Sequence, residues 1–238
     1  MSVGADLDID HGEHDSIVIS FNAPRRRNSL RGADVTALAE ALDGCPDRVA
    51  VLRSRTPGIF CSGADLRIDD AERRAVSDTL YKVYESMITR PGPVIAVVDG
   101  PAVGGGAQLS TAADLRVITT RAAWRWLGPG HGLAVGAWIL PTLVGRGRAM
   151  SLMLAQRWMT AAEAVQCGLA PAVTDTPDAD HSDLVNQLAQ LDRSALARIK
   201  QITSTPELLA GVRQERATNA SAWSGAGPLR PDRPTSII

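Results

Sequence analysis

The sequence predicts an α/β protein, and the spacing of its apolar residues is the main reason. Short runs rich in β-branched residues alternate with longer segments in which apolar residues recur at helical spacing. Such alternation is typical of folds in which helices cover a sheet. With 238 residues and 45% hydrophobic content, the chain can bury one full core. We therefore expect an α/β domain of moderate size.

The first half of the chain supplies the clearest elements. Strand-like runs and helix-period segments alternate there, the strands at 16–21, 48–53 and 94–98 and the helices at 33–42 and 72–89. Asp114 is then expected to end a further helix. Residues 115–118 follow it as another strand.

A second helical block is expected from about residue 143 to residue 167. Its apolar spacing is that of a pair of amphipathic helices. Thr160 is the expected N-cap of the later helix, because a threonine hydroxyl accepts a hydrogen bond from a first-turn amide. Gly168 is expected to end this helix, since glycine adopts the left-handed conformation that follows many helices.

The C-terminal part is expected to form helices behind a linker. Residues 174–180 are polar and predict a linker, residues 181–222 predict helices, and residues 224–238 contain prolines and predict a loose tail. We divide the chain into 1–172, the core with the start of the helical region, and 173–238, the C-terminal helices and the tail.

Composition excludes several function classes. The net charge of −1 argues against bulk attraction to nucleic acid or to an anionic membrane, because both require a basic excess. The three cysteines are far apart, without metal-like spacing, which suits a reducing compartment. The acidic N-terminus has no apolar signal region, and no run approaches a membrane-spanning length. We expect a cytoplasmic protein without membrane insertion and without a metal.

Two glycine-rich turns are the most informative motifs. The sequence FCSGADL occupies residues 60–66, and GPAVGGGAQLS occupies residues 100–110. Glycine permits close approach of a ligand, and the amides at a helix start favour an oxygen that carries negative charge. Together, two such turns can hold one carbonyl oxygen.

At these motifs the chain resembles the crotonase superfamily, the enoyl-CoA hydratase/isomerase fold. The resemblance covers roughly residues 16–172 and rests on both turns and on five further segments, Asn22–Leu30 (similar to N-R-P-x-x-x-N-A-L), Asp114–Val117, Leu143–Arg146, Thr160–Ala164 and Gly168–Leu169. It implies a core of repeated ββα units followed by helices that form a homotrimer or a dimer of trimers. It also implies an acyl-CoA ligand, with coenzyme A as part of the substrate and no separate cofactor.

The resemblance places the two oxyanion amides on Ala64 and Gly105, but the catalytic residues of the family are missing. Gln108 stands where a hydratase has its first glutamate, and glutamine can orient a water without taking its proton. The second glutamate falls on Gly128 or on Arg125, depending on the register. No Asp or Glu occurs between residues 114 and 163. We expect a site that binds and polarises a thioester but hydrates poorly.

Few residues are candidates to replace the glutamates. His131 lies in the segment that lines the acyl pocket in the family, and imidazole titrates in a useful range. Asp69 and Asp70 follow the first turn and are expected to cap a helix rather than to move protons. Cys61 and Ser62 have no paired base nearby, which argues against a nucleophile.

Other residues are expected to border the ligand. By the resemblance, Arg25 and Arg26 approach the phosphates of coenzyme A, where guanidinium contacts are favourable, and Arg67 approaches the adenine end. A solvated turn is the alternative for the arginines. The first turn contributes Ser62, Asp65 and Leu66, and Asp65 is also expected to cap a helix that begins near Leu66, which would fix the Ala64 amide.

Three tryptophans gather in the segment where the chain departs from the family. Trp124, Trp126 and Trp138 either narrow the acyl pocket or pack helices and subunits. Two functions remain open. One is an atypical enzyme of the lyase or isomerase class that acts on acyl-CoA. The other is a non-catalytic acyl-CoA carrier, sensor or assembly subunit.

Overall fold

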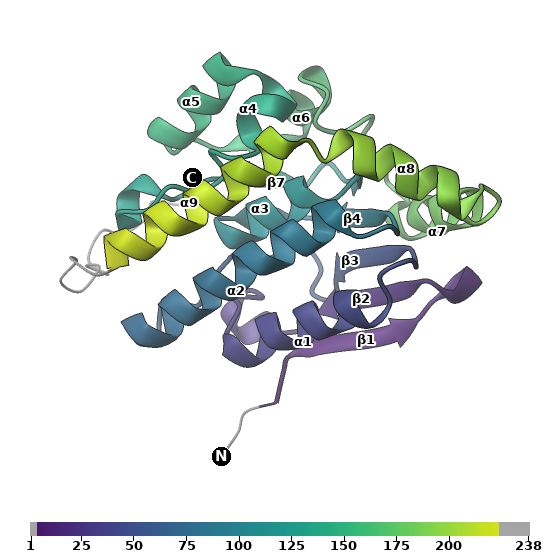
Figure 1. The fold of residues 1–238 in the computed structure, drawn as a ribbon, viewed down its shortest axis with the longest axis horizontal. Coiled ribbons are helices and arrows are strands. Elements are labelled where there is room, and N and C mark those ends of the chain that lie inside the picture. The colour runs from purple at the N-terminus through teal and green to yellow at the C-terminus, as the bar shows by residue number, and fades with distance from the viewer. Residues whose placement is uncertain (1–3, 224–238) are drawn as a thin grey trace.

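The computed structural model describes residues 4–223, which contain a five-stranded sheet. Helices pack around this sheet in Figure 1. The strands lie in the order β1 (Leu7–His11), β2 (Ile17–Phe21), β3 (Ala50–Ser54), β4 (Val94–Val98) and β6 (Leu115–Ile118). β1 is antiparallel to β2, and the other neighbouring strands are parallel. The four strands expected from the sequence are confirmed. β1 was not predicted, because its run of alternating acidic and apolar residues was interpreted only as an acidic N-terminus.

Helices cover both faces of this sheet. On one face, α1 (Gly32–Gly44) and α2 (Asp70–Thr89) pack against the larger core cluster, to which β3 and β4 contribute Leu52, Ala96 and Val98. On the other face, α7 (Pro177–Ala189) inserts Val185 among Val51, Ile95 and Val97. Two buried faces explain why β4 reads as an unbroken apolar run.

A smaller sheet carries the second glycine turn. It consists of β5 (Pro101–Val103), β7 (Ala123–Arg125) and β8 (Met159–Thr160). α3 (Gly105–Ala112) starts two residues after β5. The turn at Gly104 therefore connects the small sheet directly to the N-terminus of a buried helix.

Three short helices and a strand replace the expected helix pair after residue 143. They are α4 (Leu140–Val144), α5 (Arg146–Leu154), β8 and α6 (Ala161–Gln166). Thr160 is confirmed as a cap, since its hydroxyl accepts from the Glu163 amide at 3.2 Å while the Glu163 carboxylate accepts from the Thr160 amide at 2.9 Å. Gly168 follows α6 with φ +79° and confirms the expected end.

The C-terminal helices begin earlier than the sequence predicts. α7 starts at Pro177, so the expected linker over 174–180 is wrong in its second half, because proline at N1 starts a helix rather than prolonging a loop. α8 (Arg193–Thr203) and α9 (Pro206–Trp223) follow. α9 runs alongside α2 in Figure 1. The tail predicted at 224–238 lies outside the described residues, and the proposed division at residue 172 stays a prediction.

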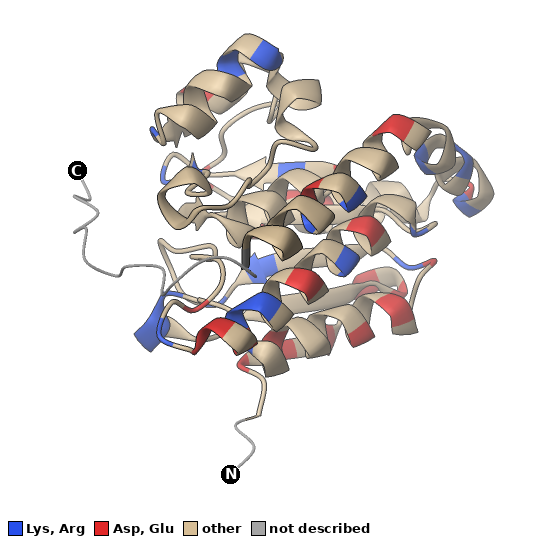
Figure 2. Ribbon diagram, turned by 60° about the vertical axis from the view of Figure 1, so that its left-hand side comes forward, with Lys and Arg blue, Asp and Glu red and all other residues tan. Residues whose placement is uncertain are grey.

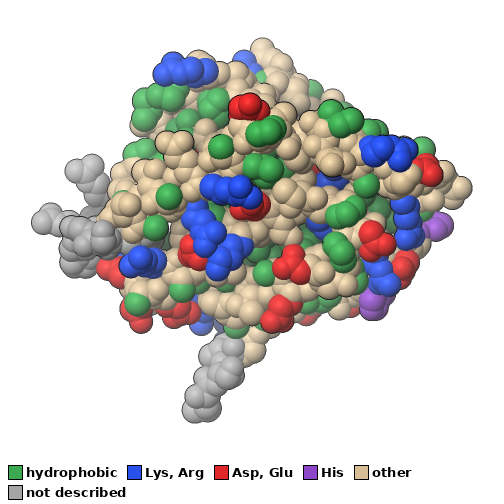
Figure 3. Space-filling view, viewed as in Figure 1, with side chains coloured by type: hydrophobic (Ala, Val, Ile, Leu, Met, Phe, Trp, Pro, Cys, Tyr) green, Lys and Arg blue, Asp and Glu red, His purple; other side chains and the backbone are tan. Residues whose placement is uncertain are grey.

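The surface carries charges of both signs. Lys and Arg are interspersed with Asp and Glu over the helices in Figure 2 and over the face shown in Figure 3. Within residues 4–223, none of the helices combines the length and apolarity needed to cross a membrane.

Candidate functional site

The two glycine turns lie against each other, and backbone hydrogen bonds hold them together. The Val103 amide donates to the Cys61 carbonyl at 2.9 Å, in a parallel bridge between Cys61 and Ala102. Gly63 has φ +80°, and a Cβ there would lie 2.9 Å from the Gly105 nitrogen. Only glycine fits this contact, since a side chain would meet both strain and the neighbouring backbone. The amides of the two turns are therefore neighbours in space.

The amide of Ala64 points away from its bridge partner. Leu30 donates to the Gly63 carbonyl at 2.7 Å and accepts from the Asp65 amide at 2.9 Å. In this parallel bridge, Gly63 and Asp65 make the hydrogen bonds to Leu30. Ala64, which lies between them, therefore directs its own N–H away from Leu30. Gly105 is the first residue of α3, whose first-turn amides have no partner within the helix.

A cavity of about 130 Å³ opens between these turns and α2. The turns contribute one wall through residues 63–64 and 104–105, which we call the turn wall. Six residues expected at the site from the sequence line this one cavity, namely Ser62, Ala64, Leu66, Gly105, Gln108 and His131. Among the described residues that line it, none is Asp or Glu.

A second wall of the cavity comes from two helices that are far apart in the sequence. Tyr81 of α2 lines the cavity with Asn219 of α9, and Glu215 of α9 supports them from behind; we call these three residues the helix wall. The Tyr81 hydroxyl donates to Glu215 Oε1 at 2.7 Å and accepts from Asn219 Nδ2 at 2.7 Å. Glu215 is 5% exposed. A buried carboxylate thus lies directly behind the cavity.

Glu215 also holds the loop that precedes α4. Its two carboxylate oxygens accept from the amides of Gly136 and Trp138, each at 3.0 Å. Asn219 clamps the same loop, because its amide group both accepts from and donates to the backbone of Ala134. Burial raises the pKa of the Glu215 carboxyl, although the hydrogen bonds from Tyr81 and the loop oppose that rise.

Gln108 is fixed by a tryptophan. The Trp138 indole N–H donates to Gln108 Oε1 at 2.7 Å, and Trp138 stacks on Tyr84 with ring centroids 6.0 Å apart. An indole N–H can only donate, so the amide oxygen of Gln108 is occupied and its NH₂ group remains for other partners. That group contacts the Tyr81 hydroxyl, where it favours the ionised phenol. Gln108 therefore acts as a hydrogen-bond donor at the position where a hydratase has a base.

His131 reaches the cavity from η3 (Pro129–His131). Burial lowers the pKa of its imidazole, and the nearby charge of Arg73 lowers it further. The ring is therefore neutral over most of the physiological pH range. Asp69 is confirmed as the N-cap of α2, because its carboxylate accepts from the Glu72 amide at 2.8 Å. Asp70 forms an ion pair with Arg73 on the same helix.

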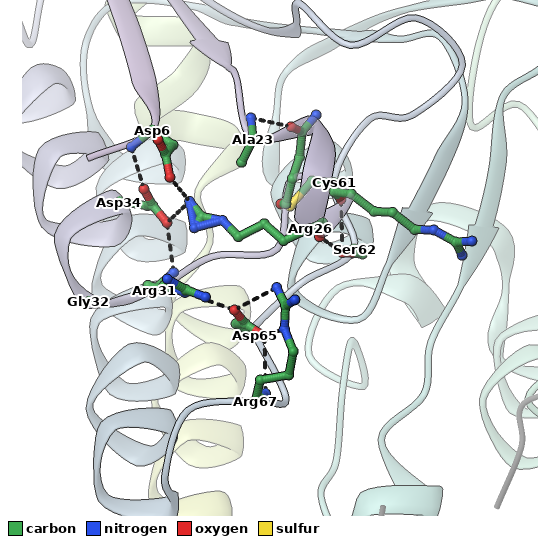
Figure 4. Close-up of polar contacts among 12 residues, drawn as sticks. Asp6, Ala23, Arg26, Arg31, Gly32, Asp34, Cys61, Ser62, Asp65 and Arg67 are labelled. Atoms are coloured by element: carbon green, nitrogen blue, oxygen red, sulfur yellow. Dashed lines mark hydrogen bonds and ion pairs between the residues drawn. The ribbon is translucent and has the colours of Figure 1, made fainter. Parts of the chain in front are cut away.

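The arginines beside the first turn divide between two roles. Arg26 is only 7% exposed and forms ion pairs with Asp34 at 2.7 Å and with Asp6 at 2.9 Å, as Figure 4 shows. These ion pairs engage its guanidinium within the fold, which argues against the phosphate contact expected for it. Arg25 is exposed, and it borders a depression that Arg26, Arg31 and Arg67 also line.

Asp65 supports the first turn in a different way from the one expected. α2 begins only at Asp70, so the prediction that Asp65 caps a helix starting near Leu66 is wrong. Instead, its carboxylate binds Arg31 Nε at 2.8 Å and Arg67 Nε at 3.0 Å (Figure 4). Although burial opposes the shift, hydrogen bonds from these arginines lower the pKa of Asp65 to about 2.

Several residues that the sequence offered as candidates do not line the cavity. Arg125 donates to the Gln156 carbonyl at 2.6 Å, and Gly128 is enclosed by the backbone near Leu133. Neither lines the cavity, whichever register is correct. Trp124 and Trp126 are fully buried in the core. Burial raises the pKa of the Cys61 thiol to about 12, which removes it as a nucleophile.

The helix wall was missed from the sequence. Tyr81 lies inside a helix that was correctly predicted, but nothing local distinguishes it from a core residue. Glu215 and Asn219 are four residues apart and so share a face of α9, which is the one available signal. That signal is weak, because the same spacing occurs on ordinary solvated helices.

A family model described as enoyl-CoA hydratase/isomerase matches residues 12–222 of the chain. Among curated relatives, the chain is similar to proteins named "Probable enoyl-CoA hydratase echA6" from Mycobacterium tuberculosis and Mycobacterium bovis. Each is 32% identical over 192 residues, which cover 78% of this chain and 77% of the relative. Human mitochondrial methylglutaconyl-CoA hydratase is 30% identical over 192 residues, covering 74% of this chain and 56% of that protein.

Solved structures agree with this match. An enoyl-CoA hydratase from Bacillus anthracis superposes with a TM-score of 0.78 at 27% identity, covering 90% of this chain and 89% of that one. A hydratase from Mycobacterium avium subsp. paratuberculosis K-10 gives a TM-score of 0.84 at 24% identity, covering 95% and 93%. The expected α/β crotonase-like fold with a C-terminal helical region is confirmed.

Proposed function

Because the chain belongs to the enoyl-CoA hydratase/isomerase family, we propose that it binds acyl-CoA thioesters in the cavity between the turn wall and the helix wall. The N–H groups of Ala64 and Gly105 hold the thioester carbonyl oxygen. The observation that carries this proposal is that these two amides are neighbours in the wall of one cavity. Two such donors favour an oxygen on which negative charge develops.

The nucleotide end of the ligand lies at the mouth of the site. Arg25 is the exposed cation of its basic triplet that lines the depression there, and Arg67 lines the same depression. A mobile guanidinium suits the phosphates of coenzyme A. The proposal needs no cofactor beyond the coenzyme A of the ligand itself.

Hydration is not the reaction that this cavity favours. A hydratase of this family needs two glutamates, and the described lining contains no carboxylate. Each missing acid or base typically costs about 10²–10⁴-fold in rate. We expect Gln108→Glu alone to leave the hydration of crotonyl-CoA slow, because the second glutamate is still absent and Glu215 lies close by. The ultraviolet absorbance of crotonyl-CoA measures this rate, and robust hydration by the single variant would refute this account of the site.

The absence of Asp and Glu from the described cavity lining also favours a second candidate function. A cavity that polarises a thioester without a lining carboxylate also suits a non-catalytic acyl-CoA carrier, sensor or assembly subunit. Calorimetric titration with saturated and α,β-unsaturated acyl-CoA, followed by mass analysis of the same samples, separates the two. Binding with a product identifies an enzyme of the lyase or isomerase class, and binding without change identifies a carrier or sensor.

A backbone substitution tests the oxyanion site itself. Gly105→Pro removes one N–H at the first helical position, where proline is well tolerated, and Gly105→Ala retains that N–H as the matched control. With a ¹³C-labelled thioester, infrared spectroscopy should show a carbonyl stretch lowered on binding to the wild type and to Gly105→Ala. Gly105→Pro should bind at least about fivefold more weakly and lower the stretch less. An unchanged stretch and affinity in Gly105→Pro would exclude the two-amide site.

We also propose, from the family, that the protein forms a homotrimer or a dimer of trimers. Ile199 and Ile202 of α8 are 60% and 77% exposed, and a neighbouring subunit would cover such side chains. Light scattering on the purified protein measures the assembly. Monomers at micromolar concentration would exclude it.

A further inference from the structure

We propose that Tyr81, with Glu215 behind it, is the base that removes a proton from the carbon adjacent to the thioester carbonyl. This inference rests on the proposed binding of acyl-CoA and extends it to proton transfer. It assigns to the helix wall the proton transfer that the two glutamates perform in a hydratase of the family. The expected substrates are acyl-CoA thioesters that carry a proton on this α-carbon.

The position of Tyr81 supports the assignment. Its side chain lines the same cavity as Ala64 and Gly105. A thioester with its carbonyl oxygen at the turn wall therefore directs its acyl part between the two walls. Glu215 does not line the cavity and reaches the ligand only through the Tyr81 hydroxyl, at 2.7 Å from its own Oε1. Tyr81 is thus the catalytic residue of the pair, and Glu215 is the positioning residue that accepts its proton.

The charge on this pair determines the direction of proton transfer. In the resting state, Tyr81 is protonated and donates to the Glu215 carboxylate. Burial and the Glu215 charge both raise the pKa of the phenol, so loss of a second proton would place two negative charges side by side. Burial also raises the pKa of Glu215, so its neutral form is accessible. Both raised pKa values favour uptake of a proton by the pair over loss of a second proton.

The Asn219 amide supports a transient negative charge on the Tyr81 oxygen, to which its Nδ2 donates at 2.7 Å. In the ligand-free protein, the Gln108 amide group also favours the ionised phenol. Gln108 can do so because Trp138 occupies its carbonyl oxygen. Glutamine rather than glutamate at position 108 also prevents a second carboxylate from facing Glu215 across Tyr81.

The proposed step balances without a further reactant. The bound α-carbon takes the place of the Gln108 amide group at the Tyr81 oxygen, which frees a lone pair there. The α C–H bond then breaks, its proton forms an O–H bond with Tyr81, and the proton that Tyr81 held moves to Glu215 Oε1. The electron pair of the C–H bond remains on the substrate as an enolate, whose oxygen the Ala64 and Gly105 amides stabilise. Tyr81 ends neutral and Glu215 ends protonated. In D₂O the reverse step returns a deuteron to the α-carbon.

Burial and ion pairs set the charge states of the groups nearest to the pair. Tyr84 lines the cavity and Cys61 is buried in the core; burial raises the pKa of each, so both stay protonated. His131 has a lowered pKa, which favours its neutral form. Arg73 lines the cavity and pairs with Asp70, and further ion pairs on α2 and α9 join Asp78 with Arg216 and Glu85 with Arg213.

Exchange of the α-protons of butyryl-CoA in D₂O, followed by mass spectrometry, tests the proposal. The wild type should incorporate deuterium at the α-carbon. Tyr81→Phe should lose at least about 100-fold of this rate, the usual contribution of a general base, while its calorimetric affinity for butyryl-CoA stays within a few-fold of wild type. Retained binding shows that the variant is folded and that only proton transfer is lost.

A second variant tests Glu215 through the pH profile. In the wild type, the exchange rate should rise with pH as the Glu215 carboxyl ionises and then reach a plateau. Glu215→Gln should lower the rate and flatten this rise, whereas Glu207→Gln, at an exposed position on the same helix, should retain both the rate and the profile. A purely structural Glu215 would leave the shape of the profile unchanged, and that result overturns its role.

The remaining outcomes separate this proposal from the function on which it rests. Wild-type protein that binds butyryl-CoA without any exchange overturns the Tyr81 assignment and leaves acyl-CoA binding intact. Exchange that survives in Tyr81→Phe overturns it as well. Failure of the wild type to bind any acyl-CoA overturns the proposed function itself.

Discussion

The two walls of the cavity differ in how the chain builds them. The turn wall comes from two short motifs whose glycines and amides act through the backbone, whereas the helix wall is assembled from side chains 134 residues apart. Backbone contacts between the two turns fix one wall, and packing of α9 against α2 fixes the other. The motifs of one wall are therefore visible in short segments of sequence, whereas the side chains of the other wall depend on how distant helices pack.

The largest expected effect tests the turn wall. A Cβ at Gly106 would lie 2.1 Å from the Cys61 carbonyl oxygen, which the backbone cannot accommodate without moving. We expect Gly106→Val to lower the free energy of unfolding by at least about 3 kcal/mol. Gly147→Ala is the control, since a Cβ at that helical position meets no atom within 4 Å. Denaturant unfolding measures both, and a stable Gly106→Val would show that the turns are not held in contact.

The next effect tests the helix wall. Glu215→Ala removes a buried carboxylate and leaves the Gly136 and Trp138 amides and the Tyr81 hydroxyl without their acceptor. We expect a loss of about 3 kcal/mol in the free energy of unfolding. Glu207→Ala, at an exposed site on the same helix, should change it by less than about 1 kcal/mol. Equal stability of the two variants would mean that α9 does not hold this wall.

A smaller effect is the pH dependence of stability, which differs between Asp65 behind the first turn and Glu215 in the helix wall. The pKa of Asp65 is about 2 when folded against an ordinary value of 3.8, so its ion pairs stabilise the fold above pH 4 and lose this contribution as the pH falls toward 2. We expect Asp65→Asn to remove about 2 kcal/mol at pH 7 and to be less harmful near pH 2. Glu215 has the opposite sign, because its raised pKa favours the fold at low pH and costs stability as the pH rises. Unfolding curves from pH 2 to pH 8 measure both trends, and a pH-independent loss in Asp65→Asn would contradict the first.

The smallest effect concerns the mouth of the site. Arg25→Ala should weaken the binding of acyl-CoA by about threefold to tenfold, more strongly at low salt, because the contact is an exposed one to phosphate. Arg27→Ala is the control, since Arg27 is also exposed but does not border the depression that Arg25 lines. Calorimetry at two salt concentrations measures the change. Equal losses in the two variants would show a general effect of charge rather than a site.

The sequence predicts the turn wall well and the helix wall hardly at all. The glycine turns, the strands at 17–21 and 94–98 and the cap at Thr160 depend on neighbouring residues, so their signals are local. Arg26 illustrates the limit, because its ion pairs with Asp6 and Asp34 become visible only when β1 and α1 meet. The absence of both family glutamates was evident from the sequence. The buried carboxylate behind Tyr81 was not, because nothing local on α9 indicates where that helix docks.

The contribution of α9 has a consequence for how the protein matures during synthesis. The ribosome releases the chain from its N-terminus, and the sheet and both glycine turns lie entirely within the first half. The cavity nevertheless stays open on one side until Asn219 has left the exit tunnel and reached α2. A nascent chain can therefore hold most of its core while the cavity still lacks the wall that Asn219 completes.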